Sequence, residues 1–209
     1  MKKLTLSLVT CFVVLTVAIG ILSWLSWQPQ EWYAPPDYLN PEVASLADRA
    51  EYRLNEEFHK VRPTEDVWKL RIKDDAMNAW LSGRLEEWMT HDQEFEFPKE
   101  LQGAQVHVTQ NGAWLAAMIT RNGESPRPIS IQFWVWVDEH ELFFEPLAIR
   151  LGRVPLPISV FKQAILDLHD SAVGIGAMVP LMDDRKVEIQ AIHLEDGAIV
   201  LTCQTQLPN

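Results

Sequence analysis

Pairs of neighbouring acidic residues are the first candidates for chemistry in this chain. They occur at Asp74/Asp75, Glu86/Glu87, Glu94/Glu96 and Asp183/Asp184. Two carboxylates on either side of a glycosidic bond can drive its hydrolysis. The first pair is explained by the start of a helix, and the second by the solvated face of that helix. Asp183 and Asp184 have no such explanation, so an envelope hydrolase that uses them together with a histidine is one hypothesis.

Metal and nucleophile motifs are missing from the sequence. Its six histidines show no H-x-x-x-H or H-E-x-x-H spacing, and its two cysteines form no CxxC pair. No G-x-S-x-G motif marks a nucleophilic serine, and Gly174-Ile175-Gly176 lacks the third glycine of a dinucleotide site. We therefore expect no catalytic residue, no metal and no cofactor, and we predict a protein without enzymatic activity.

Tryptophan and phenylalanine point instead to binding. Residues 129–137 alternate between an Ile/Phe/Val face and a face with two tryptophans, so both faces of the predicted strand are largely apolar. Such a sheet needs a cover on each face: helices, a second layer, a partner, a membrane surface or an apolar ligand. The residues that we expect to line this surface are Trp114, Trp134, Trp136, Phe143 and Phe144, with Trp80 and Trp88 from a covering helix. A packed core is the alternative explanation for the same side chains.

The amino-terminal segment carries no charged residue from Leu4 to Trp27, a run of about 24 residues. Because about 20 helical residues cross the hydrocarbon core of a bilayer, residues 1–27 predict a cytoplasmic stub and a transmembrane anchor. Lys2 and Lys3 precede the run, and no basic residue follows it before Arg49, which predicts a cytoplasmic amino terminus. We expect a single-pass protein of the bacterial inner (cytoplasmic) membrane with its C-terminal domain outside the cytoplasm. A cleaved signal peptide is the alternative, and it too would export the domain.

The rest of the chain divides into a linker and one domain. Residues 28–40 are rich in proline and polar residues and predict a short stiff linker, while residues 41–209 predict the exported domain. Helical periodicity follows Asn40-Pro41, begins again after Asp74 and appears a third time over residues 158–168. Alternating segments predict strands, with hairpin turns at Asn111-Gly112 and at residues 195–197. The fold class is α+β: an N-terminal transmembrane helix, then a curved antiparallel sheet of about six strands with two or three helices packed on one side.

Two short motifs resemble a family of anchored bacterial envelope proteins. In Leu70–Leu81, LRIKDDAMNAWL, a strand leads into a helix with an Asn-Ala-aromatic segment; Leu151–Pro157, LGRVPLP, is a turn before a helix. Both look like the corresponding segments of the YpmS-like membrane-anchored proteins, and more loosely the arrangement resembles the TULIP-type lipid-binding domains. The resemblance implies an exported domain with an apolar groove and no enzymatic activity.

Charge restricts the partners. The chain has a net charge of −11, and without Lys2 and Lys3 it keeps 16 basic and 29 acidic residues, a net charge of −13. Phosphate backbones repel such a domain, so we expect no nucleic-acid partner. Our leading hypothesis is a non-enzymatic, membrane-anchored envelope protein whose domain binds lipid or another apolar ligand. An assembly protein that docks a membrane partner through the same sheet face is the second hypothesis, and the hydrolase is the third.

Overall fold

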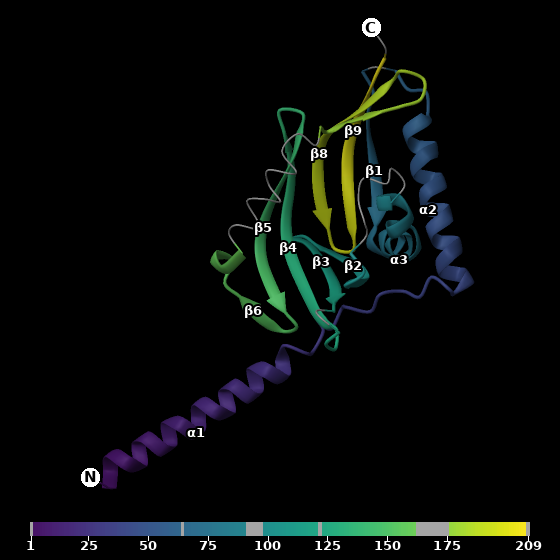
Figure 1. Ribbon diagram of the computed structural model, residues 1–209. Coiled ribbons are helices and arrows are strands. Elements are labelled where there is room, and N and C mark those ends of the chain that lie inside the picture. Colours follow the sequence, from purple (N-terminus) through teal and green to yellow (C-terminus); the bar gives the residue numbers. More distant parts are fainter. Residues whose placement is uncertain (1, 64, 91–97, 121–122, 162–175, 208–209) are drawn as a thin grey trace.

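The computed structural model describes residues 2–63, 65–90, 98–120, 123–161 and 176–207. Three α-helices and two antiparallel sheets make up this part of the chain, which confirms the predicted α+β class (Figure 1). The first sheet has the strand order β1-β9-β8-β7, and the second has the order β2-β3-β4-β5-β6. We refer to them as the four-stranded and the five-stranded sheet.

Helix α1 (Lys2–Leu25) extends away from both sheets, as Figure 1 shows. From Val9 to Trp24 its apolar side chains are exposed, and Phe12 keeps 70% of its surface in contact with solvent. The side chains described in α1 are Ser7 and those of residues 9–25. Among the described residues, no helix is both long enough and apolar enough to cross a membrane.

The four-stranded sheet forms a conventional apolar core with helix α2 (Pro41–His59). Its strands are β1 (Val67–Lys73), β7 (Met178–Pro180), β8 (Lys186–Glu195) and β9 (Ala198–Gln206). Trp68, Val187 and Cys203 are buried in this core, and Leu54 and Phe58 of α2 pack against it. The side chain of Asn40 accepts a hydrogen bond from the Glu42 amide and Pro41 begins the helix, so the predicted cap is confirmed.

The five-stranded sheet is a meander. Its strands are β2 (Leu101–Thr109), β3 (Gly112–Ile119), β4 (Arg127–Asp138), β5 (Glu141–Leu151) and β6 (Val154–Leu156). Gln110 and Asn111 turn the chain between β2 and β3, one residue before the predicted Asn111-Gly112, and Gly112 (φ 137°) begins β3. Helix α3 (Asp74–Thr90) flanks β2, where the Asn78 amide donates to the Val106 carbonyl (2.8 Å) and accepts from the Val106 amide (2.7 Å). One side chain thus satisfies both backbone groups at the sheet edge.

The prediction of one sheet with about six strands is wrong, because the described chain forms two sheets. β1 pairs with β9, far along the chain, and this pairing separates the last hairpin from the meander. The two sheets nevertheless lie side by side, with β4 next to β8 (Figure 1). The Gly197 amide donates to the Val108 carbonyl (2.9 Å), and the Ala177 amide donates to the His140 carbonyl (2.7 Å).

The predicted third helix is described only at its start. Ile158–Phe161 forms a single 3-10 turn, η1, and residues 162–168 of the prediction lie outside the described residues. Among the described helices, α2 packs against the four-stranded sheet, α3 contacts β2 and β1, and η1 contacts β5. The residues of the four-stranded core come from elements far apart in sequence.

Candidate ligand-binding site

The five-stranded sheet has one face with polar and aromatic side chains. In the register of the strands, Trp114 lies opposite both His107 and Gln132. Gln132 in turn pairs with Ala148, and Arg150 follows two residues later on β5. Side chains alternate along a strand, so these residues share a face, which we call the polar face. The other face carries Ile131 and its partner Ile149, among other apolar residues.

The segment predicted as a linker lies against this polar face. The ring of Trp32 stacks on His107 with a centroid distance of 4.9 Å and lies 6.3 Å from the ring of Trp114. The Ala34 amide donates to the Gln105 side chain (2.7 Å), and the Tyr33 hydroxyl donates to the Gly103 carbonyl (2.7 Å). Burial raises the pKa of Tyr33. This connection therefore contacts the domain along much of its length.

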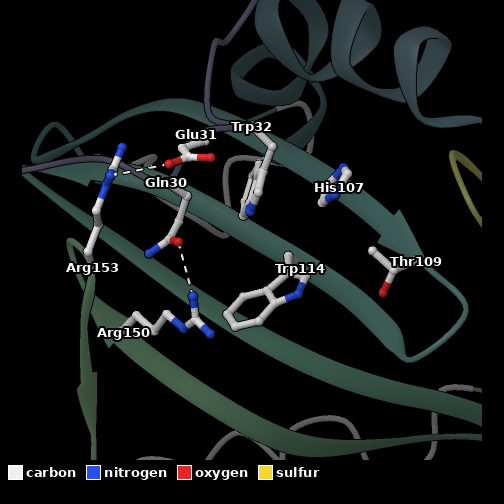
Figure 2. A pocket seen from close by; sticks show the side chains of 8 residues that line it. All are labelled: Gln30, Glu31, Trp32, His107, Thr109, Trp114, Arg150 and Arg153. Carbon is white, nitrogen blue, oxygen red and sulfur yellow. Dashed lines mark hydrogen bonds and ion pairs between the residues drawn. The ribbon is translucent and has the colours of Figure 1, made fainter.

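A cavity of about 440 Å³ lies between this segment and the polar face. We call it the basic pocket, and Figure 2 shows the residues that line it: Gln30, Glu31, Trp32, His107, Thr109, Trp114, Arg150 and Arg153. The volume is in the range typical of small-molecule sites. Most of its polar groups are hydrogen-bond donors, and Glu31 contributes its carboxylate.

Two arginines determine the charge of the basic pocket. The Arg150 guanidinium lies over the Trp114 ring, 4.8 Å from its centroid, and donates to the Gln30 side-chain oxygen (3.1 Å). Arg153 donates from Nε to the Pro29 carbonyl (3.0 Å) and forms an ion pair with Glu31 (3.3 Å). In the described chain, no carboxylate pairs with Arg150. The pocket therefore carries a net positive charge within an acidic protein.

The basic pocket lies next to the end of α1. The Arg153 amide donates to the Leu25 carbonyl (3.0 Å), and Arg127 lies over the Trp27 ring at 4.2 Å. Between β5 and β6, Gly152 has a φ of 56°, and a Cβ atom there would lie 2.5 Å from the carbonyl oxygens of Leu25 and Ser26. Only glycine accommodates both the left-handed conformation and this approach. The chain leaving α1 is thereby fastened to the turn that carries Arg153.

Three of the predicted aromatic residues continue from the pocket along the same face. Trp114 lines the pocket, and Trp134 and Trp136 follow Gln132 at alternate positions of β4. The Trp136 ring stacks on Phe143 of β5, with a centroid distance of 5.5 Å. Trp134 is 40% exposed. We call Trp114, Trp134, Trp136 and Phe143 the aromatic stripe.

The other predicted aromatic residues lie elsewhere. Phe144 pairs with Val135, so it belongs to the opposite, apolar face. Trp80 and Trp88 contact each other on α3, with a centroid distance of 6.2 Å, and neither lines the basic pocket. Trp88 is 68% exposed.

The polar half of the site was not predicted from the sequence. Trp32 and His107 meet only because the linker docks on β2, and no local pattern indicates that contact. Arg150 was the one available signal, since it is a single charge within the otherwise apolar strand end Leu147–Leu151. The planar fork of an arginine side chain matches carboxylate and phosphate groups, so an arginine on the face of a sheet is a candidate for ligand contact.

Asp183 and Asp184 have a structural explanation. The Asp183 carboxylate accepts from Arg185 Nε (2.8 Å), and this hydrogen bond lowers the pKa of Asp183. Arg185 also donates to the carbonyls of His59 (2.9 Å) and Lys60 (3.0 Å), at the end of α2. Both aspartates are exposed, and Asp184 has a φ of 65° in the turn. Among the described residues, no three His, Cys, Asp or Glu side chains converge in a way that could hold a metal ion.

Comparison with known proteins gives no assignment. No protein-family model matches the chain, and no curated protein matches it either.

Proposed function

We propose that this protein is a non-enzymatic, membrane-anchored envelope protein whose domain binds a lipid or another apolar ligand from the adjacent bilayer. One observation carries the proposal: the chain leaving α1 is fastened to the turn beside the basic pocket through the Arg153 amide and Gly152. A ligand in the pocket would therefore lie next to whatever surrounds the end of α1.

The anchor is part of the proposal. The uncharged run of residues 4–27 is longer than the part of α1 whose side chains are described, and the apolar side chains from Val9 to Trp24 are exposed. Exposed apolar surface of this extent is costly in water and favourable in a bilayer. With Lys2 and Lys3 on the cytoplasmic side, the domain would lie outside the cytoplasm at the bacterial inner membrane. The resemblance to YpmS-like and TULIP-type proteins points to the same arrangement.

The aromatic stripe supports an apolar ligand. It begins in the basic pocket at Trp114 and continues along β4 to Trp136 and Phe143. A charged end followed by an aromatic surface suits an amphiphile, because each aromatic ring offers a large area for burial.

The test is lipid extraction from the purified full chain, with mass spectrometry of the extract. We expect the wild-type protein to retain lipid and Trp134→Ala to retain at least severalfold less. Trp88→Ala is the matched control, since Trp88 is also an exposed tryptophan but lies outside the aromatic stripe. Lipid-free wild-type protein, or equal losses in the two variants, would contradict the proposal.

A role in assembly is the second candidate, and the exposure of Trp134 favours it. In that case the aromatic stripe would dock a second copy or another membrane protein. Sedimentation of the full chain in detergent distinguishes the two, because assembly through this surface predicts dimers whose population rises with concentration and falls in Trp134→Ala. A monomer at all concentrations that retains lipid supports lipid binding alone.

A further inference from the structure

The arginines near the end of α1 differ from those in the rest of the domain. Elsewhere in the described chain, arginines either form ion pairs, as Arg62, Arg71, Arg84 and Arg185 do, or are exposed to solvent, as Arg49 and Arg53 on α2 are. Arg127 and Arg150 are instead partly buried. Arg127 and Arg150 have no carboxylate partner among the described residues. In a domain with an excess of acidic residues, two unneutralised arginines at one end call for an anion.

The end of α1 explains part of this cluster. A helix C-terminus carries a partial negative charge, and there the Arg153 amide donates to the Leu25 carbonyl, while the Arg153 guanidinium donates to the Pro29 carbonyl beyond the end of α1. Arg150 is different, since its only described polar partner is the Gln30 side chain and its guanidinium is backed by Trp114. An arginine offers five N–H donors, so most of the donors of Arg150 remain for an occupant of the basic pocket.

A second unsatisfied group lies beside Arg150. Ser130 is its cross-strand partner, and its side chain is on the same face of the sheet. Ser130 is 2% exposed, and its hydroxyl has no hydrogen-bond partner in the described structure. Buried hydroxyls almost always have a partner, so Ser130 is an unsatisfied polar group beside Arg150, although it does not line the basic pocket.

We propose that the basic pocket holds the phosphate group of an anionic membrane lipid, with Arg150 as its principal ligand. This inference rests on the proposed function and specifies the head of its ligand. The planar fork of a guanidinium matches phosphate oxygens in a bidentate geometry, and charge-assisted hydrogen bonds of this kind are stronger than neutral ones. The Trp114 ring holds the guanidinium in place, and the aromatic stripe receives the apolar part of the lipid.

Three probes separate the phosphate from the apolar tails. The full chain in detergent micelles is titrated calorimetrically with short-chain phosphatidic acid, with diacylglycerol of the same chain length, and with inorganic phosphate. We expect phosphatidic acid to bind at least tenfold more tightly than diacylglycerol. Arg150→Gln should abolish this difference, and Arg150→Lys should reduce it, because lysine keeps the charge but loses the fork.

The control is Arg49→Gln, which removes the same charge from an exposed arginine whose side chain bonds Ser45 on α2. It should leave all three affinities within about twofold of the wild type. Thermal unfolding of each variant verifies that it folds.

Each outcome of these titrations bears on the phosphate site, on the proposed function or on both. Equal affinities for phosphatidic acid and diacylglycerol overturn the phosphate site but leave the proposed function standing. Binding of neither lipid overturns both. Arg150-dependent binding of inorganic phosphate as tight as that of phosphatidic acid overturns the membrane lipid as the source and assigns the pocket to free phosphate. An equal loss in Arg49→Gln overturns the specific role of Arg150.

Discussion

Each of the two sheets contains a tryptophan covered by an arginine, and the two pairs differ in their surroundings. In the four-stranded sheet, Arg62 lies 3.9 Å from the centroid of Trp68 and pairs with the Glu57 carboxylate at 2.6 Å. In the five-stranded sheet, Arg150 lies 4.8 Å from the centroid of Trp114 and has the neutral Gln30 side chain as its partner. Trp68 and Trp114 are similarly buried, with 8% and 9% of their surfaces exposed.

The two pairs differ in whether their hydrogen-bond donors and charges have partners within the protein. The Trp68 indole N–H donates to the Thr205 hydroxyl (3.3 Å), and the Arg62 charge is neutralised by Glu57. The polar and charged groups of this pair are therefore satisfied within the protein, and the pair covers an apolar core. The pair of Trp114 and Arg150 borders a cavity and leaves a positive charge unneutralised. The same two residue types thus cover an apolar core in one sheet and border a cavity in the other.

Truncating the two tryptophans is the strongest test of this comparison. Trp68→Ala should lower the free energy of unfolding by about 4 kcal/mol, because it leaves a sealed cavity in the core. Trp114→Ala should cost about 2 kcal/mol or less, because it enlarges a cavity that already exists. Urea unfolding of the full chain in detergent measures both values, and equal losses would show that Trp114 is an ordinary core residue.

The second test concerns the junction that holds the pair of Trp114 and Arg150 beside α1. Gly152→Ala places a Cβ atom 2.5 Å from two backbone oxygens of the segment leaving α1. It should detach that segment and speed amide hydrogen exchange over residues 26–36 by at least tenfold. Gly197→Ala is the matched control: its φ of 75° imposes similar backbone strain, but the nearest atom to its Cβ is at an ordinary 3.7 Å. Equal exchange in the two variants would mean that strain alone, and not the junction, is responsible.

The third test exchanges each arginine for glutamine. Arg62→Gln should lower the free energy of unfolding by about 1–2 kcal/mol, since it leaves the half-buried Glu57 carboxylate without this partner and uncovers Trp68. Arg150→Gln should change it by less than about 0.5 kcal/mol, since it neutralises a charge without a carboxylate partner. Urea unfolding again measures both. A larger loss in Arg150→Gln would indicate a structural role for that arginine and weaken the comparison.

Local patterns predicted single elements in both regions but not the long-range contacts of either. The cap at Asn40 and the two faces of β4 follow from neighbouring residues, and the structure contains both. The turn predicted at Asn111-Gly112 lies one residue earlier, at Gln110-Asn111. The pairing of β1 with β9 could not be predicted, because it depends on which of several apolar strands meets another across most of the chain. The same limit applies to the site, where Trp32 meets His107 through a segment whose composition is that of a free linker.

The predicted aromatic residues are divided between different surfaces for a related reason. Phe143 and Phe144 are adjacent, so one of them had to face away from Trp136, and the register decides which. Trp80 and Trp88 form a pair of their own on α3, beyond the reach of any strand pattern. Residue type therefore identified a surface, while the long-range register determined which of those residues belong to it.

At neutral pH the smallest effect on stability is expected at Cys203, where the closed character of the four-stranded core can be tested without changing that core. Burial raises the pKa of the Cys203 thiol to about 11, above the 8.5 or so of a free cysteine, so at pH 8 its thiolate fraction falls by about 200-fold. In a Cys11→Ser background, we expect the folded chain to react with a thiol reagent at least 100-fold more slowly than the chain in urea.

Because the thiol ionises first in the unfolded state, stability should be unaffected below pH 8 and should fall between about pH 9 and 11. A Cys203→Ala variant supplies the control for that fall. Rapid labelling of the folded protein at pH 8 would mean that this core opens readily. The contrast between the buried core of the four-stranded sheet and the cavity beside the five-stranded sheet would then be lost.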